Sequence, residues 1–169
     1  MVEIKPIQNH QIDEVKSIIW SVCQEIFQVS RQEVIKCYDD LSDLEEIETN
    51  YFFNRGVFLV ILDRNKVVGS GGIKRFNDEI CELKRMWLLP EYRGRGSAKK
   101  LGNILLNFAR KNGYKKVRLD IFSEQKQARA INFYRKLGFY NIERYFPSDG
   151  NGWIDSTVFM EKNLVKINN

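Results

Sequence analysis

The chain has 169 residues, of which 43% are hydrophobic, and these values fit one globular domain with an adequate core. It has 27 basic and 22 acidic side chains and a net charge of +5, a modest excess that is more typical of a well-solvated surface than of a nucleic-acid-binding protein. His10 is the only histidine and the three cysteines form no CxxC spacing, so we expect no metal centre, no histidine-based catalytic triad and no disulfide framework.

The N-terminus and the cysteines indicate the compartment. Residues 1–6 lack a basic region followed by an apolar run, so we expect no signal peptide. No apolar stretch approaches the roughly 20 residues that span a bilayer. Three free thiols suit a reducing environment. We therefore expect a cytoplasmic protein without a membrane or nucleic-acid partner.

The first third of the chain predicts a short strand followed by helices. Val2–Ile7 alternates apolar and polar residues, as a strand does. Apolar residues recur every three or four positions over 12–26, behind Asn9 as N-cap, which predicts an amphipathic helix. The S-x-x-E pattern at Ser30–Glu33 and at Ser42–Glu45 is typical of helix N-termini. Acidic residues around the second pattern are expected on a solvated face, or at a rim that meets a cationic substrate.

The rest of the chain predicts a strand-rich core with two helices. Two β-rich runs joined by Asp63–Lys66 predict a hairpin, and a third run that ends at Pro90 is expected beside it. A glycine-rich turn and an amphipathic helix that ends at Gly113 follow. This order predicts an α/β fold with one mixed, mostly antiparallel sheet and helices on its faces. The expected strands cover 56–62, 66–74, 79–89, 116–122, 139–145 and 152–162, with a further helix over 128–137.

The segment LLPEYRGRGSA at 88–98 lies between a predicted strand and a predicted helix. Gly94 and Gly96 allow a tight turn that presents consecutive backbone N–H groups in front of the helix N-terminus. Arg93 and Arg95 add charge, so the segment suits a pyrophosphate, although an ordinary strand–turn–helix connection uses the same residues. A dinucleotide-binding fingerprint is excluded because lysine stands where its third glycine belongs, and the P-loop pattern is absent.

At this point the sequence resembles the Gcn5-related N-acetyltransferase (GNAT) superfamily. The family signature Q/R-x-x-G-x-G/A is matched by RGRGSA at 93–98, and a second family segment by QARAINFYRKLGF at 127–139. The resemblance reaches from about Gly56 to Phe159. It implies a single N-acetyltransferase domain over 1–169, in which 1–55 form an N-terminal strand and substrate-side helices and 56–163 form the acetyl-CoA-binding core.

The resemblance implies acetyl-CoA as co-substrate, without a metal. Strand backbone at 86–88 would pair with the pantetheine arm, the N–H of Met86 would face the thioester oxygen, and the loop amides would hold the pyrophosphate. Gln127 stands where the family commonly has asparagine, which is chemically equivalent but one methylene shorter. The implied cofactor-binding residues are Met86, Trp87, Leu88, Arg93, Gly94, Arg95, Gly96, Ser97, Ala98 and Gln127.

Two residues are candidates for acid–base catalysis. Tyr134 matches the family tyrosine that protonates the departing CoA thiolate, and Phe133 fits the core better. Glu82 lies eleven residues before the motif arginine, where histone-acetylating members carry a general base. Glu82 is about 13 Å of strand from Met86, so one water bridges the two only if a bulge shortens the distance or the substrate reaches across. An exposed strand residue would equally account for a glutamate here. Cys81 points to the opposite strand face and no base accompanies it, so we do not expect an acyl-enzyme.

The expected function is acetyl transfer from acetyl-CoA to a primary amine of a small molecule or peptide by direct attack. The alternative is a catalytically weak acyl-CoA-binding sensor or interaction module, and a basic nucleic-acid binder ranks last. The sequence reveals neither the acceptor nor the acyl-chain preference, and it leaves a homodimer open. Candidate wall residues of the acceptor site are Trp20, Phe27, Phe52, Asp149 and Trp153.

Overall fold

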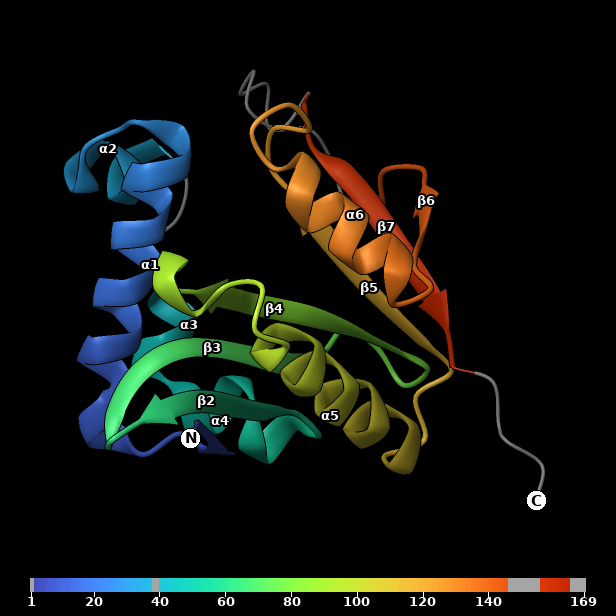
Figure 1. Ribbon diagram of the computed structural model, residues 1–169. Coiled ribbons are helices and arrows are strands. Elements are labelled where there is room, and N and C mark those ends of the chain that lie inside the picture. The colour runs from blue at the N-terminus through green and yellow to red at the C-terminus, as the bar shows by residue number, and fades with distance from the viewer. Residues whose placement is uncertain (1, 38–39, 146–155, 165–169) are drawn as a thin grey trace.

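The computed structural model describes residues 2–37, 40–145 and 156–164, and within them a seven-stranded sheet has helices packed on both faces (Figure 1). The strands are β1 (Glu3–Pro6), β2 (Val57–Asp63), β3 (Lys66–Arg75), β4 (Ile80–Leu88), β5 (Lys116–Ile121), β6 (Tyr140–Ile142) and β7 (Val158–Asn163). The helices are α1 (Ile12–Phe27), α2 (Arg31–Cys37), α3 (Ser42–Glu45), α4 (Ile47–Asn50), α5 (Ser97–Lys111) and α6 (Ala128–Lys136). Short 3-10 turns are η1 (Asn9–Gln11), η2 (Phe52–Asn54) and η3 (Pro90–Tyr92).

The sheet has the strand order β1-β2-β3-β4-β5-β7-β6. Neighbouring strands run antiparallel except for β4 and β5, which are parallel. The elements follow the chain order that the sequence predicts, from a first strand and helices to the two last strands. The prediction of an α/β fold with a mixed, mostly antiparallel sheet is therefore confirmed.

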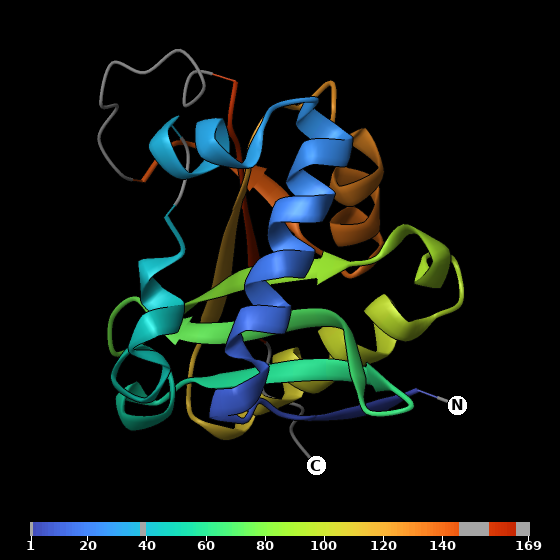
Figure 2. The same cartoon turned by 90° about the vertical axis from the view of Figure 1, so that its left-hand side faces the viewer.

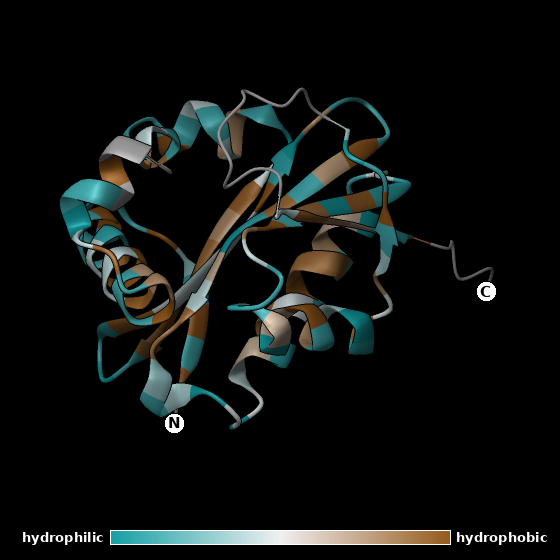
Figure 3. Cartoon of the chain, turned by 90° about the horizontal axis from the view of Figure 1, so that it is seen from above, coloured by the Kyte–Doolittle hydropathy of each residue, from teal (hydrophilic) through white to brown (hydrophobic). Residues whose placement is uncertain are grey.

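Different parts of the chain cover the two faces of the sheet. Helix α1 crosses in front of β2, β3 and β4 (Figure 2), and it packs with α3 and α4 against buried residues of β2 such as Phe58 and Val60. Helices α5 and α6 cover the other face, where Leu83 and Leu119 join their core. Seen from above, the sheet lies between these two helical layers (Figure 3). Because side chains alternate along a strand, successive strand residues face different helices.

Two local sequence patterns form as predicted. Ser30 and Glu33 make a capping box at the start of α2, in which Ser30 N–H donates to Glu33 Oε2 at 2.7 Å and Glu33 N–H donates to Ser30 Oγ at 3.2 Å. The predicted hairpin turns through Arg64 and Asn65, which both have a positive φ, 48° and 66°. This backbone conformation matches the twist of the two strands that the turn joins.

Two helix starts differ from the prediction. Asn9 lies in the 3-10 turn η1, and the N-cap of α1 is Gln11. Helix α3 begins at Ser42, but its N-cap is Leu41, which has a φ of 57° and is 1% exposed. The N-cap of α3 is thus the buried leucine, whereas the local S-x-x-E pattern predicts the serine that follows it.

The end of the chain differs in length from the prediction. Strand β6 covers three residues of the expected strand 139–145. The first part of the expected strand 152–162 lies outside the described residues, and β7 begins at Val158. Among the residues that the structure describes, no helix is long and apolar enough to cross a membrane.

A β-bulge in β4 is the local irregularity that shapes the site. Between Ser70 and Gly72 the register with β3 shifts, so that Arg85 and Met86 oppose the single residue Gly71. Arg85 has a φ of 57°, and the Ser70 hydroxyl donates to its carbonyl at 2.8 Å. A Cβ on Gly71 would lie 2.9 Å from Met86 Sδ and 3.1 Å from Leu105 Cδ1, so a larger residue there would displace these packed side chains.

Strands β4 and β5 separate two residues before the bulge begins. Their parallel pairing covers only Ile80–Glu82 and Lys116–Arg118. From there the two strands diverge and leave a fork in the sheet (Figure 1). The last residues of β4 therefore have β3 on one side and the fork on the other.

Candidate functional site

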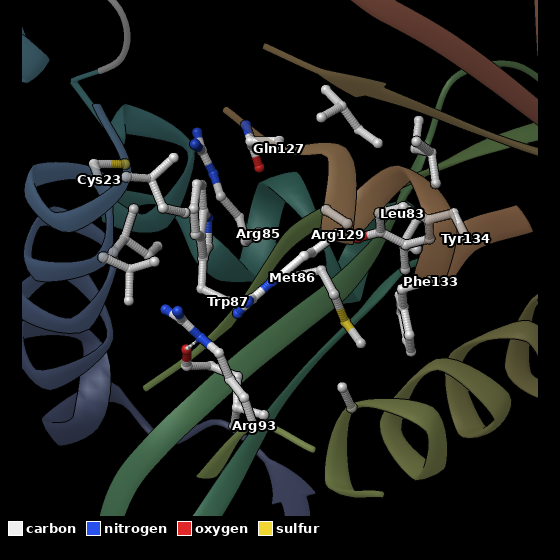
Figure 4. Close-up of a pocket in the computed structure, with 18 of the residues that line it drawn as sticks. Cys23, Leu83, Arg85, Met86, Trp87, Arg93, Gln127, Arg129, Phe133 and Tyr134 are labelled. Atoms are coloured by element: carbon white, nitrogen blue, oxygen red, sulfur yellow. Dashed lines mark hydrogen bonds between the residues drawn. The ribbon is translucent and has the colours of Figure 1, made fainter. Parts of the chain in front are cut away.

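A cavity of about 900 Å³ occupies the fork. It is bounded by α1, by the diverging ends of β4 and β5, by the loop before α5 and by α6 (Figure 4). In the close-up, Cys23 of α1 lies on one side of the cavity and Tyr134 of α6 on the other. The predicted site residues that line it are Met86, Trp87, Leu88, Arg93, Gly94, Gly96, Ala98, Gln127 and Tyr134.

The backbone of β4 presents a free edge to this cavity. The backbone N–H of Leu89 donates to the Val68 carbonyl in β3 at 3.0 Å, so the backbone groups of Leu89 face β3. In an antiparallel pair the facing residues alternate, so the groups of Leu88, and of Met86 two residues earlier, turn toward the fork. Arg93 confirms this direction, because its Nε donates to the Leu88 carbonyl at 3.0 Å. An extended chain could therefore pair here as an added strand would.

The glycine-rich loop borders the cavity at the start of α5. Gly94 has a φ of 74° and Gly96, the N-cap of α5, a φ of 84°. A Cβ on either glycine would meet no atom within 4 Å among the described residues, so the space in front of the loop is open. The first-turn amides of α5 and the helix dipole favour an anion at this point.

Two predicted loop residues do not line the cavity. The guanidinium of Arg95 is 5.8 Å from the ring of Tyr92, on an exposed part of the loop. Ser97 is buried as the first residue of α5. Both lie within the predicted motif, but the structure brings only its other members to the cavity wall.

Arg93 connects the loop to α1 across the mouth of the cavity. Its Nη1 and Nη2 donate to the two carboxylate oxygens of Glu25 at 2.9 and 2.7 Å. The hydrogen bond from Arg93 holds the pKa of Glu25 below its usual value. The sequence predicts Arg93 beside a phosphate, but it does not reveal this partner on a helix 68 residues away.

Gln127 and Tyr134 come from the ends of α6. Gln127 Nε2 donates to the Phe122 carbonyl at 2.9 Å, which fixes the connection between β5 and α6. Tyr134 is 7% exposed, and its ring packs edge-on against Phe133 and Phe139 at 5.2 and 5.7 Å. Its phenol makes no hydrogen bond with any residue of the described ranges. The expectation that Phe133 fits the core better is wrong, because Phe133 is half-buried at the cavity and Tyr134 belongs to the core.

The protonation state of Tyr134 follows from its surroundings. Burial, and then the negative charge of Asp120, raises the pKa of the Tyr134 phenol well above its ordinary value. The phenol therefore keeps its proton throughout the physiological range. It can therefore act as a proton donor in the cavity, but it cannot serve as a base there.

Glu82 does not line the cavity. Its Oε1 accepts a hydrogen bond from the phenol of Tyr145 at 3.0 Å, and the Tyr145 ring packs against Phe76 and Phe159. The structure thus does not bring Glu82 together with Tyr134. Cys81 is fully buried, and burial raises the pKa of its thiol to about 12, so it stays protonated at neutral pH.

Arg85 at the bulge is bound to the acidic segment before α4. Its Nε and Nη2 donate to the Asp43 carboxylate at 3.2 and 2.5 Å, and the Tyr51 hydroxyl donates to the same group. Burial raises the pKa of Asp43, but the hydrogen bonds from Arg85 and Tyr51 outweigh it and hold the pKa below the usual value. The prediction of a solvated acidic face is therefore wrong at Asp43, which is 11% exposed and supports the bulge.

The fork itself holds an ion pair that the sequence does not predict. Lys84 Nζ on β4 donates to Asp120 Oδ1 on β5 at 3.1 Å, and both residues line the cavity. Lys84 and Asp120 are both polar residues within predicted strands. Their polar character is the only signal in the sequence that could have indicated them. That they meet depends on the parallel register of two strands, which no local pattern specifies.

One of the candidate wall residues of the acceptor site lines the cavity. Phe27 lines the cavity, and Lys126 Nζ donates to its carbonyl at 3.0 Å. Trp20 and Phe52 do not line the cavity. The two other candidates, Asp149 and Trp153, lie outside the described residues.

Comparison with known proteins relates this chain to one family. A sequence profile of the acetyltransferase (GNAT) family matches residues 17–139. An uncharacterized N-acetyltransferase, YjgM of Escherichia coli K12, is 34% identical over 125 residues, which are 72% of this chain and 72% of that protein. For several mammalian relatives the match covers 48% to 53% of their length.

Solved structures share the fold. A GNAT-family acetyltransferase from Staphylococcus aureus Mu50 superposes with a TM-score of 0.80 at 24% identity, and the match covers 98% of this chain and 100% of that one. The PaiA N-acetyltransferase of Thermoplasma acidophilum, solved in complex with coenzyme A, superposes with a TM-score of 0.73 at 20% identity, over 96% of this chain and 99% of that one.

Proposed function

This chain belongs to the acetyltransferase (GNAT) family, and we propose that it transfers an acetyl group from acetyl-CoA to a primary amine of a small molecule or peptide. The observation that carries the proposal is the fork between β4 and β5, where a free strand edge leads to a glycine-rich loop at a helix N-terminus. Acetyl-CoA joins an extended amide-containing arm to a pyrophosphate, and these are the two parts that such a site can bind.

The residues present fit this co-substrate. The edge at Met86 and Leu88 offers backbone N–H and C=O groups to the pantetheine amides. The open space before Gly94 and Gly96 leaves room for phosphate oxygens close to the backbone. The fold neighbour from Thermoplasma acidophilum holds coenzyme A. When bound, acetyl-CoA supplies the acetyl thioester; the protein supplies orientation, hydrogen bonds and proton transfer.

We assign two chemical roles within this proposal. The Met86 N–H faces the fork and is the hydrogen-bond donor for the negative charge that develops on the thioester oxygen. Tyr134 donates its proton to the departing sulfur, because the phenol lines the cavity in its protonated form. For Glu82 the role of general base rests on family resemblance, and its carboxylate is bound to Tyr145 outside the cavity.

The experiment is an assay of CoA thiol release by the purified protein. Polyamines, amino acids, aminoglycosides and peptides are each tested with acetyl-CoA, and mass spectrometry detects the acetylated amine. We expect at least one amine to give thiol release in step with its acetylation. An acyl-CoA-binding sensor, the alternative function, would instead bind acetyl-CoA and release no thiol with any amine of the panel.

A further inference from the structure

The carboxylates of the cavity have different surroundings. Among the described residues that line it, Glu25 and Asp120 are the acidic ones. Glu25 lies at the mouth, where Arg93 occupies both of its oxygens. Asp120 lies in the fork, its side chain is 11% exposed, and Lys84 binds only its Oδ1. Within the part of the chain that the structure describes, the second oxygen of Asp120 has no hydrogen-bond partner and stays available to a ligand.

The strand pattern directs Asp120 and Lys84 to the face of the sheet opposite to α6. Leu119 and Ile121 of β5 belong to the core beneath α5 and α6, as does Leu83 of β4. Because side chains alternate, Asp120 and Lys84 face the other side and meet across the fork, two residues beyond its last paired position. Tyr134 reaches the same cavity from the α6 side. A molecule bound at Asp120 thus approaches the fork from the face opposite to the phenol.

We propose that Asp120, oriented by Lys84, binds the ammonium group of the acceptor and takes the proton that the amine loses before it attacks. This inference rests on the proposed function, and it identifies the acceptor as a cation that reaches the fork from the α1 side. A nearly buried carboxylate with a free oxygen forms a charge-assisted hydrogen bond with an ammonium ion. Amines with a pKa near 10 need a base at neutral pH, and a carboxylate in reach supplies it.

The proton and bond changes balance as follows. One N–H bond of the ammonium breaks and its proton passes to an Asp120 oxygen. The freed nitrogen lone pair forms the bond to the acetyl carbon, and a second N–H bond of the same nitrogen then breaks and gives its proton to solvent. The carbon–sulfur bond breaks, and Tyr134 gives its proton to the sulfur. Solvent then takes up the proton from Asp120 and restores the phenol, so the sum is one thioester and one ammonium converted to an amide, a thiol and a released proton.

Lys84 orients Asp120 and does not replace it as the base. Burial lowers the pKa of the Lys84 ammonium, but the carboxylates of Asp120 and Glu82 outweigh burial and raise it. Lys84 therefore stays protonated near neutral pH. The other titratable or charged groups that act on this cluster from the elements around it are Arg85 on β4, Arg118 on β5, Tyr134 on α6 and Tyr145 after β6.

The test is the pH dependence of kcat/KM for the panel amine that the wild type acetylates fastest. We expect Asp120→Asn to lower kcat/KM by about a hundredfold or more near neutral pH. The loss should shrink toward pH 10, where the free amine needs no base. The Kd for acetyl-CoA should stay within about threefold of wild type, since other residues form the proposed pantetheine edge and phosphate loop. Asp78→Asn is the matched control, because Asp78 is 82% exposed outside the cavity, and it should keep the wild-type profile.

The same measurement on Glu82→Gln decides between the two carboxylates. A pH-dependent loss in Glu82→Gln and not in Asp120→Asn overturns the proposal in favour of Glu82. A wild-type profile in Asp120→Asn, or a loss that is equal at every pH, also overturns it. If the wild type acetylates no amine of the panel, the proposed function fails and this inference fails with it.

Folding of the variant is controlled separately. Removing one partner of a nearly buried ion pair can destabilise a protein by about 3–5 kcal/mol, because the other charge stays unpaired. If Asp120→Asn does not fold, Lys84→Gln/Asp120→Asn removes both charges, and the same pH-dependent loss is expected. Asp120→Glu keeps a carboxylate and should recover part of the rate. A wild-type profile in the double variant contradicts the proposal.

Discussion

Replacing Gly96 by alanine tests the placement of the phosphate loop. Gly96 is the N-cap of α5 and has a φ of 84°, and a Cβ there would meet no atom within 4 Å. The substitution therefore causes no steric clash in the free protein, and its cost is backbone strain of about 1–2 kcal/mol. If the backbone keeps this conformation, the alanine methyl group occupies the space that a phosphate must approach. If the backbone relaxes, a rotated amide occupies it instead.

The matched control is Gly113→Ala at the other end of α5. Gly113 has a φ of 81°, and the nearest atom to a Cβ there is Nη2 of Arg55 at 3.9 Å, an ordinary contact. Its strain is therefore the same, and it does not line the cavity. We expect both variants to melt roughly 2–8 °C below wild type, given about 2–4 °C per kcal/mol for a chain of this size.

Isothermal titration with acetyl-CoA separates the two variants. Gly96→Ala should raise the Kd by about tenfold or more, which corresponds to about 1.4 kcal/mol, whereas Gly113→Ala should leave it unchanged. Equal affinities in Gly96→Ala and Gly113→Ala would refute the placement of the phosphate loop. A loss of affinity in both would show that strain in α5, and not contact with the ligand, controls binding.

Two further variants test other parts of the account. Tyr134→Phe should lower kcat by roughly ten- to a thousandfold and leave the Kd for acetyl-CoA unchanged. The loss should be similar across pH 7–9, because the raised pKa keeps the phenol protonated there. An undiminished kcat, with chemistry limiting the rate, would show that Tyr134 is only a packing residue. Asp43→Asn should lower the free energy of unfolding at pH 7 by about 3 kcal/mol, because it breaks the contacts with Arg85 and Tyr51. The pKa of Asp43 is depressed in the folded state, so the stabilisation by Asp43 is present above the unfolded value near 3.9 and is lost as pH falls through the folded pKa. Urea denaturation should therefore show a smaller difference in stability between wild type and variant below about pH 4 than at pH 7. The same difference at both pH values would contradict this.

Much of the fold could be predicted because its signals are local. The hairpin depends on two adjacent residues, Arg64 and Asn65, and the end of α5 on Gly113, which has a positive φ. The glycine-rich turn before α5 was likewise predictable, since its glycines and the start of α5 are neighbours in sequence. Where buried residues override a local pattern, as Leu41 does at α3, the prediction was wrong.

The fork and its ion pair could not be predicted, because they depend on distant residues. The bulge at Arg85 lies opposite Gly71 on the facing strand, and Arg85 binds Asp43 on a helix 42 residues earlier. Lys84 and Asp120 are 36 residues apart, and they meet only because β4 and β5 pair in parallel and then separate. The sequence shows two polar strand positions but not their register.

The measurement that tests the central claim most directly is the melting temperature with acetyl-CoA, ATP or NAD at equal concentration. The claim is that the edge at 86–88 binds the pantetheine arm, which ATP and NAD lack. At about 100 times its Kd, acetyl-CoA should stabilise the protein by about 2.7 kcal/mol and raise the melting temperature by roughly 5–10 °C, while ATP and NAD leave it unchanged. Equal stabilisation by ATP would contradict the claim and reduce the cavity to a general phosphate site.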